Sequence, residues 1–192
     1  MKLVYIIGMS LLLTSCGDVV DSLDQSEVPD YTKEWLREQQ GQVLTFRNSA
    51  GQVRTITVAR KEQILQGQSK AGSFETEIIT LHYRNGPDSL LNLTLEAISN
   101  SITVTHLGSR CGVINTSNSP GRTSFNSYEV PRLGNPIVAQ DTMIGGRTYR
   151  HLGRMGVPTA AHLADTLTNA YFSRAEGLVA FTTKRAGLWH RQ

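Results

Sequence analysis

Apolar and polar residues alternate along most of the chain between residues 43 and 107, and this period of two predicts β-strands. In the first strand, for example, Leu44 and Phe46 fall on one face. Residues 48–51, with the sequence NSAG, separate two alternating runs and predict a hairpin. We expect an antiparallel meander of five strands, two of them within 43–60 and the others at 74–84, 90–98 and 102–107.

The second half of the chain has a different pattern. Residues 108–136 are rich in Gly, Ser, Asn, Pro and Thr, which predicts a long loop. Gly145 and Gly146 then stand between two alternating runs and predict a tight turn that needs positive φ. Three short strands should close the chain, with turns at 175–177 and 185–187.

The expected fold is therefore mainly β: an antiparallel meander curled into a barrel or half-barrel, with a β-sandwich as the alternative. One short helix is expected near residues 31–40, with Asp30 as its N-cap and Gly41 after its end. We expect Val179 and Phe181 to share one face of a closing strand, with Trp189 beside them on the next strand. All three residues then have a structural role.

The N-terminus has the pattern of an export signal. Lys2 is followed by an apolar run at 3–13, which is too short to span a bilayer. Small residues come next, and Leu13-Thr14-Ser15-Cys16 resembles the lipobox of bacterial lipoproteins. The resemblance implies that residues 1–15 are removed as a signal peptide and that Cys16 carries a diacylglycerol and an N-acyl chain. The alternative is an ordinary secretory signal with a chance cysteine.

After Cys16, residues 16–30 are acidic and contain no Lys or Arg, which predicts a solvated, flexible tether. Residues 31–192 are then long enough for a single domain with its own core. Lipidation of Cys16 would leave Cys111 without a partner, so no intrachain disulfide is expected. We expect no cofactor other than the lipid on Cys16.

The end of the chain resembles that of small exported lipoproteins of the Bacteroidetes type. The residues concerned are IGGRTYRHL at 144–152, AYFSRAEGLVAF at 170–181 and LWHRQ at 188–192. The resemblance implies a β-meander and a location in the cell envelope, anchored by lipid to the outer membrane and facing either side. It implies no catalytic residue.

Four Asp-Ser/Thr-apolar triplets resemble the O-glycosylation sequon of the same bacteria. The resemblance implies Ser22, Ser89, Thr142 and Thr166 as glycosylation sites. Turn and cap chemistry explains the same triplets equally well.

Charge is divided unevenly, because residues 101–192 contain ten basic and four acidic residues. The arginines of this half are scattered and have no interleaved aromatic residues, so we expect a solvated basic face and no nucleic-acid binding.

Catalytic signatures are weak. Cys111 has no surrounding family signature, Glu75 and Glu77 share one strand face, and the histidines lack metal-ligand spacing. The favoured function is a non-catalytic, membrane-anchored module that binds a small apolar or glycan ligand or an envelope protein. A structural accessory without a pocket, and then a hydrolase with a dispersed site, are the alternatives.

Overall fold

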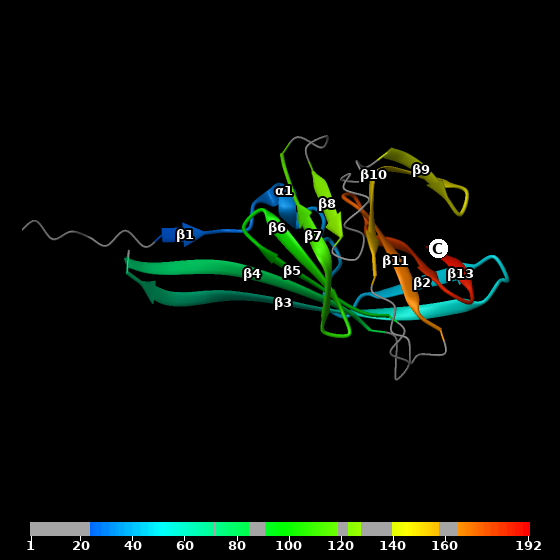
Figure 1. Cartoon of the computed structure of the whole chain (residues 1–192), viewed down its shortest axis with the longest axis horizontal. Helices are drawn as coiled ribbons and strands as arrows, with labels where there is room; N and C mark the ends of the chain where they lie inside the picture. Colours follow the sequence, from blue (N-terminus) through cyan, green and yellow to red (C-terminus); the bar gives the residue numbers. More distant parts are fainter. Residues whose placement is uncertain (1–23, 71, 85–90, 119–122, 128–139, 158–164) are drawn as a thin grey trace, which may run out of the picture.

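The computed structural model describes residues 24–70, 72–84, 91–118, 123–127, 140–157 and 165–192. Their strands form one sheet, in the order β8-β7-β6-β5-β4-β3-β2-β13-β12-β11-β10-β9, with β1 paired to β4 beside this path (Figure 1). The elements are β1 (Asp24–Ser26), α1 (Asp30–Lys33), β2 (Val43–Asn48), β3 (Val53–Ser69), β4 (Gly72–Arg84), β5 (Asn92–Ile98), β6 (Ser101–His106), β7 (Ser109–Asn115), β8 (Ser124–Ser127), β9 (Gln140–Ile144), β10 (Arg147–Gly156), β11 (Leu167–Ser173), β12 (Gly177–Thr183) and β13 (Gly187–Arg191).

The sheet curls into a nearly closed barrel. Neighbouring strands along the path are antiparallel, and β10 contacts β7 and β8, which lie at the other end of the strand order. The mainly β fold and the five-strand meander from β2 to β6 are thus confirmed. The tight turn is confirmed as well, since Gly145 and Gly146 have φ values of 59° and 80°.

Residues 27–42, which we call the plug segment, fill part of the barrel's core. Val28, Trp35 and Leu36 are buried and belong to one apolar cluster with residues from most of the strands. Thr32 is also buried, and its hydroxyl lies 2.6 Å from that of Thr116. The core therefore depends on a segment that precedes the first barrel strand.

The helix is shorter than predicted. It ends at Lys33, and Pro29 instead of Asp30 occupies the N-cap position. Trp35, Leu36 and Glu38 are all buried, and a helix cannot present three such closely spaced residues to one narrow apolar face. The chain leaves the helix so that the three side chains can enter the core.

Two expected irregular segments contain strands. The predicted loop at 108–136 includes β7 and β8, because the short run around Cys111 pairs with β6 despite its loop-like composition. The predicted tether at 16–30 includes β1, and Val28 is buried. Here too the structure differs from the expectation, because backbone pairing with β4 orders an acidic segment.

Val179 and Phe181 do not share a face, contrary to the prediction. The β11–β12 register shifts between Tyr171 and Phe172, which places an extra residue in β12 at Val179. Such a bulge turns the following side chains to the other face. Phe181 consequently packs with Trp189 in the main core, whereas Val179 packs in a second cluster with Ile144.

Candidate functional site

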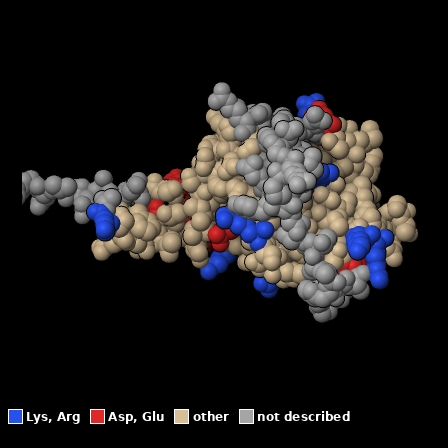
Figure 2. All heavy atoms as spheres, in the orientation of Figure 1, with Lys and Arg blue, Asp and Glu red and all other residues tan. Residues whose placement is uncertain are grey.

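A hairpin projects from the barrel (Figure 1) and carries the most exposed apolar side chains of β3. It consists of residues 61–69 of β3 and 72–77 of β4, which we call the arm. Ile64 and Leu65 are 66% and 51% exposed and, as neighbours in a strand, point to opposite faces. Figure 2 shows the arm standing clear of the body with few charged atoms on this face.

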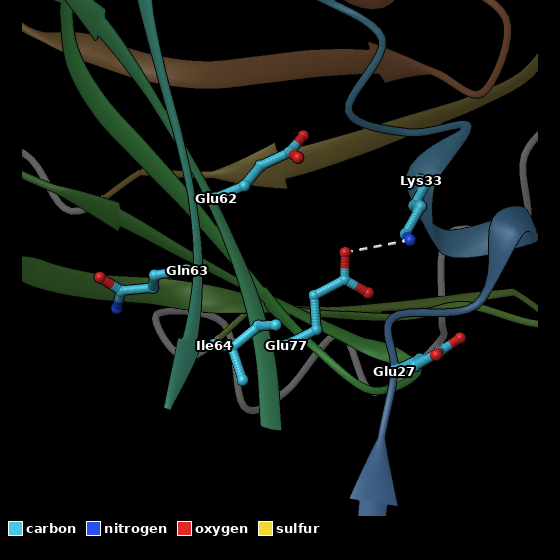
Figure 3. A pocket seen from close by; sticks show the side chains of 6 residues that line it. All are labelled: Glu27, Lys33, Glu62, Gln63, Ile64 and Glu77. Atoms are coloured by element: carbon cyan, nitrogen blue, oxygen red, sulfur yellow. Dashed lines mark ion pairs between the residues drawn. The ribbon is translucent and has the colours of Figure 1, made fainter. Parts of the chain in front are cut away.

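A groove runs between the arm and the plug segment (Figure 3). Its volume is about 470 Å³, and a smaller hollow of about 140 Å³ adjoins it toward β1. The groove is lined by Glu27, Lys33, Glu62, Gln63, Ile64 and Glu77.

Most of the charged side chains in the groove hold the fold together. Glu77 forms an ion pair of 3.0 Å with Lys33, drawn in Figure 3, and accepts a 2.9 Å hydrogen bond from the Val28 N–H. Glu62 forms an ion pair of 2.6 Å with Arg60. These contacts tie the plug segment to the arm, so the groove's acidity is largely spent on internal bonds.

The direction of β1 fixes where the chain enters the domain. β1 pairs in parallel with β4, with Asp24 opposite Phe74, two residues after β4 begins at Gly72. Since β4 runs from the arm's tip toward the barrel, β1 does the same. The chain therefore enters the domain at the tip of the arm.

A buried carboxylate lies inside the barrel. Glu38 accepts a 2.7 Å hydrogen bond from the Leu178 N–H, and its second oxygen is buried without a hydrogen-bond partner. Burial raises the pKa of Glu38, while the Leu178 bond opposes the rise. The neighbouring Tyr83 hydroxyl is buried too, and burial raises its pKa well above the ordinary value. Both residues belong to the core cluster's surroundings and not to the groove.

The predicted modification sites fall in different environments. Cys16, Ser22 and Ser89 lie outside the described residues. Thr142 is exposed on β9. The Thr166 hydroxyl is buried, so a sugar could reach it only before folding or after local opening.

Asp165, which precedes Thr166, accepts hydrogen bonds of 3.0 and 2.9 Å from the N–H groups of Thr166 and Arg185. This is the turn chemistry that we considered as the alternative.

The residues weighed for catalysis are not assembled into a reactive site. Cys111 is buried in β7 and forms no disulfide with the described residues. Glu75 and Glu77 both face the groove hollow, where Glu75 accepts a 2.6 Å hydrogen bond from Gln66. In the described ranges no group of three His, Cys, Asp or Glu side chains could hold a metal ion. No helix among these residues is long and apolar enough to cross a membrane.

Sequence reasoning missed the arm and the buried Glu38. The adjacent Ile64 and Leu65 stand alone in a polar run, KEQILQGQS, and that isolated apolar pair was the available signal. Nothing in the local sequence marks Glu38 as buried, because its partners come from β12, 140 residues away.

Comparison with known protein families, with curated proteins and with solved structures gives no match for this chain.

Proposed function

We propose that this protein is a lipid-anchored protein of the bacterial cell envelope that binds a partner protein along its arm, without catalysis. The observation that carries the proposal is the projecting hairpin with Ile64 and Leu65 exposed on its two faces. Exposed apolar side chains on an extended strand are typical of surfaces that bind another chain.

The anchor and the arm support each other. Asp24 lies eight positions after Cys16 and enters at the arm's tip. Eight extended residues reach at most about 27 Å. A lipid on Cys16 would therefore hold the arm near the outer membrane, where other envelope proteins are concentrated.

Site-specific photo-crosslinking in the native envelope tests the proposal. A photoreactive residue at Leu65 should give a discrete adduct, and the same residue at Val53 should not. Val53 is the matched control, because it lies on the same strand at the barrel end and is similarly exposed, at 53% against 51%. Equal labelling at the two positions, or none at Leu65, would refute arm-directed binding.

The anchor is tested separately. Cys16→Ala should abolish palmitate incorporation and release the protein from the membrane fraction at high salt. A variant that still incorporates palmitate would show that the lipobox interpretation is wrong.

A further inference from the structure

The backbone of β3 shows which of its groups face away from β4. The Val58 N–H donates to the Gln42 carbonyl at 2.9 Å, and the Arg60 N–H donates to the Gln40 side chain at 2.6 Å. Both acceptors lie on the side of β3 opposite to β4. The outward-facing groups in this part of β3 therefore belong to even-numbered residues.

The same parity continues along the arm. The register between β3 and β4 is continuous from Thr57 to Ser69, so no bulge intervenes. The N–H and C=O groups of Glu62, Ile64 and Gln66 consequently face outward. Among the described residues, β4 is the only strand that pairs with this stretch of β3. An edge of this kind is a template for one more strand.

We propose that the outer edge of the arm pairs with the same edge of a second copy of this chain. The two β3 strands run antiparallel about a two-fold axis at Ile64. The inference rests on the arm being the binding surface proposed above, and it names the partner.

Backbone geometry permits this register. In an antiparallel ladder, a residue with outward groups must face another residue with outward groups. With the axis at Ile64, Ile64 faces Ile64 of the second copy and Glu62 faces Gln66. Three pairs of this kind provide about six backbone hydrogen bonds.

Charge favours the same register over its neighbours. Lys61 and Glu62 are the charged residues of residues 61–68, so this stretch has no net charge. An axis at Lys61 or at Glu62 would place like charges directly opposite, which destabilises a sheet. With the axis at Ile64, Lys61 faces Gly67 and Glu62 faces Gln66.

The position opposite Lys61 is shaped to receive it. Gly67 pairs with Phe74 across the hairpin, and a Cβ built on Gly67 would lie 2.4 Å from the Phe74 ring. The ring therefore lies over the glycine. Lys61 of the second copy would project on this face and bring its ammonium group to the aromatic ring, a favourable cation–π arrangement.

The barrels do not obstruct this pairing. The Gln40 side chain occupies the edge at Arg60, so the open stretch begins at Lys61. In the proposed register Arg60 faces Gln68, near the tip of the second copy's arm. Each barrel thus begins where the other arm ends, and the two barrels lie at opposite ends of the paired arms.

Disulfide trapping in the native envelope, with the full-length chain, tests the inference. Facing residues of a hydrogen-bonded antiparallel pair have Cα atoms about 5.5 Å apart, within the range of a disulfide. Ile64→Cys should therefore give a disulfide-linked dimer of twice the chain mass. Leu65→Cys is the matched control, because Leu65 would face Gln63 and lie beyond disulfide reach of Leu65 in the second copy.

Each outcome decides between the two proposals. A dimer from Ile64→Cys and none from Leu65→Cys supports self-pairing in this register. The reverse pattern overturns it. An adduct of Ile64→Cys with a different protein overturns self-pairing and leaves the proposed function standing. No adduct at either position overturns self-pairing and counts against the arm as a binding surface.

A charge pair at the axis gives a second test. Two differently tagged copies with Ile64→Lys should no longer co-purify, because two lysines would meet on the axis. Mixing Ile64→Lys with Ile64→Glu should restore co-purification. Retention of the Lys–Lys pair would overturn the inference and would indicate that the copies merely share a detergent micelle.

Discussion

Trp189→Ala should destabilise the protein strongly, because Trp189 completes the sheet and the core at once. β13 lies between β12 and β2, with Trp189 opposite Phe181 on one side and Asn48 on the other. The indole is 1% exposed and stacks on Phe181 with the ring centroids 5.8 Å apart. The Arg54 guanidinium lies 4.9 Å from the indole centroid.

Truncating a buried tryptophan to alanine typically lowers the free energy of unfolding by about 3–5 kcal/mol. For a chain of this length, 1 kcal/mol corresponds to about 2–4 °C in Tm. We therefore expect Tm to fall by about 6–20 °C in thermal unfolding followed by circular dichroism. Urea unfolding should show a lower midpoint with a similar slope.

Two variants make the test specific. Trp189→Phe should lose less than half as much stability, because it keeps an aromatic ring beside Phe181 and removes a buried indole N–H that has no hydrogen-bond partner. Leu188→Ala, on the same strand at 38% exposure, should change the free energy of unfolding by less than about 1 kcal/mol. If Trp189→Ala unfolds within a degree or two of the unmodified protein, Trp189 does not close the fold and becomes a candidate ligand contact.

Three further predictions concern the core and the arm. Burial raises the pKa of Glu38, so the folded chain binds its proton more readily than the unfolded chain, and stability falls as pH rises from the ordinary value of 4.5 through the folded pKa. Glu38→Gln keeps an acceptor for the Leu178 N–H and should be more stable than the unmodified protein at pH 8 but not at pH 4; urea unfolding at both values checks this, and lower stability at pH 8 would contradict it. Gly67→Ala should push the Phe74 ring aside and speed hydrogen exchange in the arm at an unchanged Tm, whereas a lower Tm would place the arm in the global folding unit. Cys111 should react with a thiol reagent only as fast as the protein opens, and immediate reaction in the native state would contradict its burial.

The barrel strands were predictable where one face is buried and a turn has a chemical signature. The alternation at Leu44 and Phe46 placed β2 correctly, and Gly145-Gly146 marked the β9–β10 turn by its need for positive φ. These signals are local, because side-chain period and turn conformation depend on a few neighbouring residues.

The arm was not predictable in this way because its strands do not bury one face. Residues 61–69 are mainly polar, and β3 continues through them because β4 pairs with it residue by residue. Polar cross-strand pairs such as Gln66 with Glu75 stabilise the hairpin without an apolar pattern. β1 escaped prediction for a related reason, since three residues are ordered by a parallel partner about 50 positions away.

The anchor and the self-pairing arm constrain each other. Antiparallel arms place the two chain entries at opposite ends of the shared edge, which residues 61–67 span over about 20 Å at 3.3 Å per residue. Each Cys16 lies at most about 27 Å of extended chain from its own β1. Two lipids can then enter one bilayer only when the paired arms lie along its surface, with both ends at similar height. Arms standing upright would hold one entry farther from the bilayer than the other and would strain the more distant tether. Lipid anchoring and self-pairing together therefore predict a dimer whose arms lie flat on the membrane with a barrel beyond each end.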